Sequence, residues 1–136
     1  MQIKQCTVED VQLLAKLNKL FIEEEDPEIH VSLPHLEDRM LSYINSEYNA
    51  FFFQHDDKTV GYALCSKSKT PMYLRQFYIS NNERRKGYGK EAFTQLLEYL
   101  SINQNDIDVY AWNDSGVAFW RSLGFNKRRY NMGYNL

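Results

Sequence analysis

The first part of the chain changes from strand-like alternation to the spacing of apolar residues that is typical of a helix. Residues 2–7, QIKQCT, alternate as a short strand does. The stretch T-V-E-D that begins at Thr7 resembles a capping box, so a helix is expected to start there. The buried face of that helix would hold Val11, Leu14, Leu17 and Phe21.

A second helix is expected to begin near Ser32, after an acidic stretch that Pro27 interrupts. Pro34 would lie in the first turn of this helix, where the missing backbone N–H costs nothing. Apolar residues recur at helical intervals from that point on. They are Leu36, Met40, Tyr43 and Ile44.

The rest of the chain alternates between strand and helix patterns. Strands are predicted at 49–54, 60–66, 72–80, 107–112 and 125–135, the first two joined as a hairpin by the polar turn HDDKT. One helix is expected after residue 91, with Ala92, Phe93, Leu96, Leu97 and Leu100 on its buried face. A shorter helix at 115–123 would stop at Gly124, a glycine of the type that follows helix ends.

The predicted order of elements is β-α-α-β-β-β-α-β-α-β. The strand–helix–strand step across residues 72–112 implies a parallel pair inside an otherwise antiparallel sheet. A length of 136 residues is typical of one domain. We therefore expect a single domain, residues 1–136, of mixed α/β architecture with a mostly antiparallel sheet flanked by helices.

Composition narrows the function without identifying it. The net charge of −2 argues against a protein whose main role is to coat nucleic acid. No apolar run approaches the roughly 18 residues that cross a bilayer, and the start of the chain lacks the apolar core of a secretory signal. We expect no nucleic-acid partner and no membrane association.

Cysteine and histidine usage gives no sign of a metal or redox centre. Cys6 and Cys65 stand far apart without a C-x-x-C pattern, which favours reduced thiols and a cytoplasmic location. The three histidines, His30, His35 and His55, lack the spacing of zinc ligands. No metal site is predicted.

The stretch ERRKGYGKE, residues 83–91, combines cations and glycines just before a predicted helix. The first amides of a helix have no partner within it, and together with the helix dipole they favour an anion. Glycine allows a ligand to approach the backbone closely. The stretch therefore has the parts of a pyrophosphate site, although an ordinary turn with solvated charges would have the same composition.

Two other phosphate motifs can be compared with this stretch. A P-loop requires G-x-x-x-x-G-K-[ST], and here Glu91 follows Lys90. The dinucleotide pattern G-x-G-x-x-G/A is met by Gly87, Gly89 and Ala92. The chain supplies a single β-α-β crossover, however, whereas dinucleotide-binding units repeat it. A nucleotide-dependent oxidoreductase therefore remains a minor alternative.

The segment FYISNNERRKGYGKEAF resembles the acetyl-CoA-binding motif of the GCN5-related N-acetyltransferase (GNAT) superfamily, [QR]-x-x-G-x-[GA]. Arg84, Gly87 and Gly89 occupy its three specified positions. NDSGVAFWRSLGF is similar to a second segment of that family, N-x-x-A-x-x-x-Y-x-x-x-G-F. In that segment Gly116 stands in place of the alanine and Trp120 in place of the tyrosine. The order of elements matches as well, so the resemblance covers essentially the whole chain.

The resemblance implies an acetyl-CoA-dependent N-acetyltransferase with an acyl-CoA N-acyltransferase fold, and many relatives form dimers. Backbone groups of Phe77, Tyr78 and Ile79 would bind the pantetheine arm, and Asn113 would bind it from the neighbouring strand. The pyrophosphate would lie on the loop that begins at Arg84. The cofactor-binding residues implied there are Arg84, Arg85, Lys86, Gly87, Tyr88, Gly89 and Lys90, with Trp120 packed against either the cofactor or the core.

The catalytic groups are less fully specified. Relatives often carry a carboxylate five residues before the asparagine, a position that Asp108 occupies as a candidate base. Trp120 does not titrate, so it cannot replace the family tyrosine as the acid. Tyr110, Tyr130, another hydroxyl or solvent would protonate the thiolate. A non-catalytic acyl-CoA-binding module is the alternative.

The acceptor is expected to be an amine, either a small molecule or a peptide. The acidic run from Glu23 to Asp26 stands near the end of the first predicted helix, where negative charge is mildly unfavourable. Glu24 and Glu25 are therefore candidates for attracting a cationic acceptor, although a solvated acidic loop would look the same.

Overall fold

The computed structural model describes residues 1–66, 68, 71–102, 105–107, 114–129 and 131–134. Its strands are β1 (Gln2–Gln5), β2 (Tyr48–His55), β3 (Lys58–Ser66), β4 (Met72–Ile79) and β5 (Asn105–Ile107). Its helices are α1 (Val11–Glu25), α2 (Leu33–Ile44), α3 (Tyr88–Leu100) and α4 (Asp114–Ser122), with short 3-10 turns η1 (Val8–Asp10) and η2 (Asn81–Glu83).

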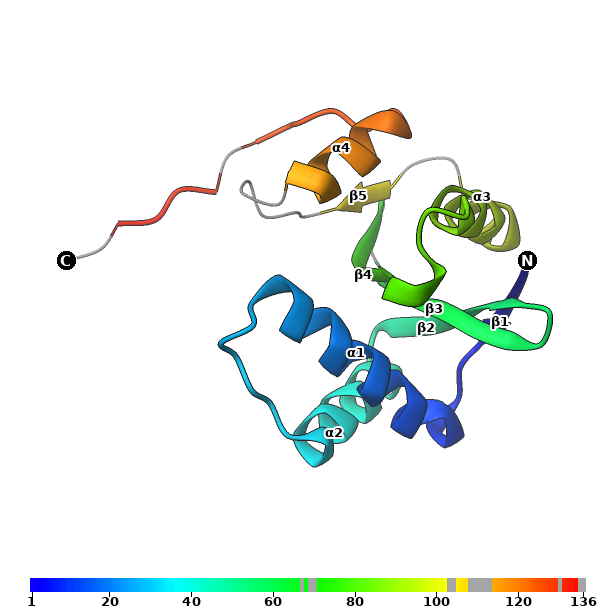
Figure 1. The fold of residues 1–136 in the computed structure, drawn as a ribbon, viewed down its shortest axis with the longest axis vertical. Coiled ribbons are helices and arrows are strands. Elements are labelled where there is room, and N and C mark those ends of the chain that lie inside the picture. The colour runs from blue at the N-terminus through cyan, green and yellow to red at the C-terminus, as the bar shows by residue number, and fades with distance from the viewer. Residues whose placement is uncertain (67, 69–70, 103–104, 108–113, 130, 135–136) are drawn as a thin grey trace.

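The strands form one sheet in the order β1-β2-β3-β4-β5. The pairs from β1 to β4 are antiparallel, and β4 pairs with β5 in parallel through the α3 crossover. Helices α1 and α2 lie on one side of the sheet and α3 and α4 on the other (Figure 1). The predicted mixed, mostly antiparallel α/β fold is therefore confirmed.

The core consists of two apolar clusters, one on each face of the sheet. Alternate residues of the central strands supply both, so Phe52 packs toward α1 and α2 whereas Phe51 and Phe53 pack toward α3. Cys6 belongs to the first cluster and Cys65 to the second, and both thiols are free. Burial raises the pKa of each thiol to about 12, so both stay protonated near neutral pH.

The predicted helix boundaries are confirmed by their caps. The Thr7 amide donates to Asp10 Oδ2 at 2.8 Å, which completes the capping box ahead of α1. The Ser32 hydroxyl accepts from the amide of His35 at the start of α2. Gly124 has φ +99° after α4, and its amide donates to the carbonyl of Arg121 at 3.0 Å.

The predicted final strand is wrong in its described part. Residues 125–129 and 131–134 form no strand and run outward from the end of α4 (Figure 1). Met132 and Tyr134 are 87% and 86% exposed. Alternation in the sequence makes a strand only where a neighbouring edge offers hydrogen bonds, and no described strand pairs with this segment.

In the part of the chain that the structure describes, no helix is long and apolar enough to cross a membrane.

Candidate functional site

The loop between β4 and α3 presents a row of backbone amides that have no partner in the described structure. Arg85 has φ +64° and Gly87 has φ +78°, with Lys86 between them at negative φ. This alternation turns successive amides toward one side, as in anion-binding nests. The first hydrogen bond of α3 runs from the Glu91 amide to the Gly87 carbonyl at 3.2 Å. We call the amides of residues 85–90 the amide cradle.

Two of the four cations around the cradle are already paired within the protein. Arg84 Nε donates to the Ile79 carbonyl at 2.9 Å, and its Nη2 donates to Glu24 Oε2 at 2.6 Å. Lys86 Nζ donates to Glu83 Oε2 at 3.0 Å. Arg85 and Lys90 are exposed and make no ion pair with the described residues. Arg85 and Lys90 are therefore the two cations available to bind an anion.

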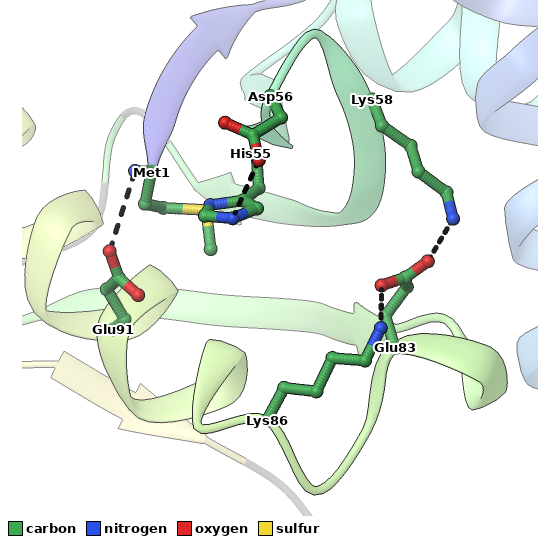
Figure 2. A network of polar contacts seen from close by, with 7 residues as sticks. All are labelled: Met1, His55, Asp56, Lys58, Glu83, Lys86 and Glu91. Atoms are coloured by element: carbon green, nitrogen blue, oxygen red, sulfur yellow. Dashed lines mark hydrogen bonds and ion pairs between the residues drawn. The ribbon is translucent and has the colours of Figure 1, made fainter.

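Glu83 lies beneath the cradle and is only 5% exposed. Its carboxylate accepts hydrogen bonds from Lys58, the first residue of β3, and from Lys86 (Figure 2). Because both donors are cations, they hold the pKa of Glu83 below its usual range, Lys58 having the larger effect. The sequence analysis did not select Glu83 or Lys58, although a single carboxylate ahead of three consecutive cations was visible in it.

We expect the stability of the protein to depend on this carboxylate at acidic pH. The folded pKa of Glu83 is lowered, so its contribution is present above the usual glutamate pKa of about 4.3 and is lost as the pH falls through the folded value. Lys58→Met should bring the pKa of Glu83 back toward that usual value. The variant should then unfold at a higher pH than the wild type in a circular dichroism titration.

Lys16→Met is a matched control for that titration, because Lys16 is exposed on α1 and makes no ion pair with the described residues. If Lys58→Met and Lys16→Met unfolded at the same pH, the Lys58–Glu83 pair would have no part in acid stability.

The three residues proposed to bind the pantetheine arm through their backbone lie at the end of β4. Phe77 and Ile79 face α3, whereas Tyr78 faces α1, where its ring stacks on Phe21 with centroids 5.4 Å apart. Tyr78 is 3% exposed, and burial, followed by the nearby Glu24 carboxylate, raises its pKa to about 12. The Tyr78 hydroxyl therefore stays protonated and donates to Glu24 Oε1 at 3.2 Å.

Strand β4 contains an irregularity next to Leu74, the last residue with a described pairing to β5. Leu74 pairs with Cys65 of β3 and Gln76 with Leu64, so Arg75 is an extra residue that forms a β-bulge. The described pairing with β5 covers Met72 to Leu74. The bulge thus separates the residues of β4 that have a described pairing to β5 from Phe77, Tyr78 and Ile79, which pair with β3.

Some candidate residues lie outside the part of the chain that the structure describes. They are Asp108, Tyr110 and Asn113, together with Tyr130 as an alternative acid. Their predicted roles remain predictions.

Trp120 lies in an aromatic cluster between β4, α3 and α4. Its ring centroid is 4.9 Å from that of Phe119, 5.2 Å from those of Phe77 and Phe125, and 5.5 Å from that of Phe93. Phe119 in turn contacts the cradle, because a Cβ added to Gly89 would lie 3.0 Å from its ring. Of the two roles expected for Trp120, packing in the core is the one that these contacts support.

The two acidic candidates for acceptor binding differ in their surroundings. The Glu24 carboxylate is bonded to Arg84 and Tyr78, so it connects the end of α1 to the end of β4 and to the loop that follows it. Glu25 is exposed at the last position of α1. Of the two, only Glu25 has no hydrogen bond or ion pair with the described residues.

Two open grooves lie near the loop between β4 and α3. One of about 400 Å³ separates the end of α1 from the end of β4 and is lined by Leu20, Glu24, Lys58, Thr59, Tyr78, Ser80, Asn81, Asn82 and Glu83. The other, of about 590 Å³, runs between α3 and α4. Lys90 is its one lining residue from the cradle, so this groove lies beside the cradle.

The fold is shared with solved acetyltransferases. A possible acetyltransferase from Clostridium difficile 630 matches with a TM-score of 0.78 and 18% identity, over 99% of this chain and 97% of that one. The PaiA N-acetyltransferase from Thermoplasma acidophilum, solved with coenzyme A, matches with a TM-score of 0.74 and 15% identity, over 96% and 92%. An aminoglycoside acetyltransferase from an uncultured soil metagenomic sample, solved with sisomicin, matches with a TM-score of 0.70 and 18% identity, over 99% and 95%.

No curated protein matches the chain. The sequence model of the acetyltransferase (GNAT) family, however, matches residues 14–125, which includes the signature at Arg84, Gly87 and Gly89 and the aromatic segment around Trp120. This match covers most of the chain, and the fold agrees with it. The chain therefore belongs to the GNAT acetyltransferase family.

Proposed function

We propose that the protein is an acetyl-CoA-dependent N-acetyltransferase that acts on a primary amine. The observation that carries this proposal is the amide cradle of residues 85–90, whose N–H groups have no partner in the described structure. A helix start with free amides and two unpaired cations, Arg85 and Lys90, suits the pyrophosphate of coenzyme A. Family membership and a relative solved with coenzyme A support the same assignment.

The end of β4 would hold the pantetheine arm through the backbone of Phe77, Tyr78 and Ile79, and Asn113 would hold it from the next strand. Bound acetyl-CoA would supply an activated thioester next to these groups. The acceptor nitrogen would attack the thioester carbonyl directly in a ternary complex, and the C–S bond would break. Asp108 is the proposed acceptor of the amine proton, and Tyr110 or solvent would protonate the departing thiolate.

The cationic acceptor proposal is best tested at Glu25, because neutralising Glu24 would also remove the ion pair of Arg84. Glu25→Gln should raise the Michaelis constant for cationic amines and leave that for uncharged amines unaltered. Aminoglycosides belong to the panel, since one relative was solved with sisomicin. An equal Michaelis constant in both enzymes for every cationic amine would remove Glu25 from the acceptor site.

The proposed activity is tested by thiol release from acetyl-CoA across a panel of amines. Calorimetry with coenzyme A, acetyl-CoA and NAD accompanies it. Binding of the first two ligands with turnover of an amine is the expected result. Binding without turnover of any amine would favour the non-catalytic acyl-CoA-binding module. Binding of NAD alone would favour a dinucleotide enzyme and overturn the proposal.

We expect Arg85→Ala and Lys90→Ala each to weaken coenzyme A binding about two- to fivefold, the range for one solvent-exposed ion pair. The loss should shrink at high salt, because exposed charges are screened. Lys16→Ala on α1 makes the same change in net charge away from the loop and should bind like the wild type. Calorimetry at low and high salt measures all three, and wild-type affinity in both loop variants would contradict the assignment of these cations.

A further inference from the structure

The turn end of the β2–β3 hairpin contacts the loop that carries the amide cradle. Lys58 follows the two-residue turn of Asp56 and Asp57 and donates to the carboxylate of Glu83. Among the buried residues of the described structure, Glu83 is the one with a charged side chain. Burying a carboxylate is costly unless it is paired with a cation. The pair therefore fixes the base of the loop to the hairpin.

A second contact joins the same turn to the other end of the loop. The ring of His55, the last residue of β2, lies 4.8 Å from the ring of Tyr88, the first residue of α3. Lys86 connects the two contacts, because its ammonium bonds Glu83 (Figure 2). The same ammonium lies 5.8 Å from the centre of the Tyr88 ring. The hairpin thus contacts Glu83, just before the cradle, and Tyr88, within it.

Helix α3 fixes residues 88–90 of the cradle, whereas residues 85–87 precede the helix. The amides of 85–87 form no hydrogen bonds with the described residues, and Arg85 has a left-handed backbone that a residue with a Cβ adopts at a cost. A loop of this kind would lose its conformation unless neighbouring side chains determined it. Binding is stronger when such a loop is ordered before the ligand arrives, because less entropy is then lost.

We propose that Lys58 and Glu83 are positioning residues, which hold the amide cradle in the conformation that receives the coenzyme A pyrophosphate. This inference rests on the proposed function and adds to it a role for a hairpin that lies outside the cofactor signature. Neither residue needs to touch the ligand. Lys86 belongs to the same network, because its ammonium is bonded to the Glu83 carboxylate. We therefore assign Lys86 to the positioning of the loop and not to phosphate binding.

The test compares coenzyme A binding in Lys58→Met, Lys58→Arg and Glu83→Gln by calorimetry. Lys58→Met removes the ammonium and keeps the length of the side chain, and we expect binding about three- to tenfold weaker, as for the loss of one ordinary hydrogen bond. Lys58→Arg keeps a cation that can bind the carboxylate and should restore affinity. Lys4→Met is the matched control, since Lys4 pairs with Asp10 at 3.2 Å on another part of the surface.

Hydrogen exchange separates positioning from a general loss of stability. In Lys58→Met the hydrogen-bonded amides that flank the cradle, those of Arg84 and Glu91, should exchange faster than in the wild type, and saturating coenzyme A should remove the difference. Exchange elsewhere in the chain should rise by much less than at these two amides. The Lys58 side chain is 66% exposed, so this variant should fold even if Glu83→Gln does not.

The outcomes distinguish this inference from the proposed function. If the wild type bound no coenzyme A, the proposed function would fail and the positioning role with it. If the wild type bound coenzyme A and Lys58→Met bound it equally well, with unchanged exchange at Arg84 and Glu91, the positioning role alone would be overturned. Weaker binding with exchange raised uniformly along the chain would also overturn it, because that pattern indicates a purely structural pair.

Discussion

Gly61→Ala should destabilise the protein more than any other glycine-to-alanine substitution in the described structure. Gly61 lies on β3 opposite Ile79 of β4, and a Cβ placed on it would be 2.1 Å from the carbonyl oxygen of Tyr78. That oxygen belongs to the backbone of a paired strand, so the clash can be relieved only by moving β3 away from β4. We expect a loss of at least about 3 kcal/mol in the free energy of unfolding, the upper part of the range for overpacking.

The same substitution should impair coenzyme A binding, since Tyr78 is one of the three β4 residues proposed to bind the pantetheine arm. Two other glycines calibrate the result. Gly133→Ala meets no atom within 4 Å and should be neutral. Gly87→Ala also meets nothing, but its φ of +78° should cost about 1–2 kcal/mol. Urea unfolding of the three variants measures the order of their stabilities. A urea midpoint of Gly61→Ala no lower than that of Gly133→Ala would refute the close approach of Gly61 to the Tyr78 carbonyl oxygen.

Local patterns predicted most of the elements because the forces that set them act within a few residues. The capping box at Thr7, the cap at Ser32 and the glycine after α4 all involve neighbours in sequence, and all three are confirmed. The parallel β4–β5 pair also followed, because a strand–helix–strand step leaves few alternatives. The prediction of a final strand was wrong because a strand forms only where the edge of another strand, distant in sequence, is free to pair with it. The alternation of residues does not show whether such an edge exists.

The pairing of charges around the cradle could not be predicted in the same way. Arg84 bonds Glu24, which lies sixty residues earlier, and Lys58 bonds Glu83 across twenty-five residues. Both pairs exist only because the fold brings α1 and the β2–β3 turn next to the loop. The sequence analysis therefore counted four cations for the phosphate, whereas the structure leaves Arg85 and Lys90 without an ion pair to the described residues. It also assigned Glu24 to the acceptor, although Arg84 and Tyr78 bind its carboxylate.

Trp120→Ala is expected to lower both stability and coenzyme A affinity. The ring of Trp120 contacts those of Phe77, Phe93 and Phe119, so its removal would open a cavity between α4, α3 and β4. Because the side chain is half-buried, we expect a loss of about 2–3 kcal/mol, below the usual cost of truncating a fully buried tryptophan. Phe119 would lose a neighbour, and Phe119 is the side chain that lies against Gly89 at the start of α3.

Trp120→Phe separates packing from a direct contact with the cofactor. It keeps an aromatic ring among the same neighbours and should cost less than Trp120→Ala, because it leaves a smaller cavity. If Trp120 acts through packing, Trp120→Phe will bind coenzyme A like the wild type while Trp120→Ala binds it weakly, both measured by calorimetry well below their melting temperatures. A Trp120→Phe variant of wild-type stability that bound coenzyme A poorly would instead place the indole against the cofactor. In that case the aromatic segment would be part of the binding site as well as its support.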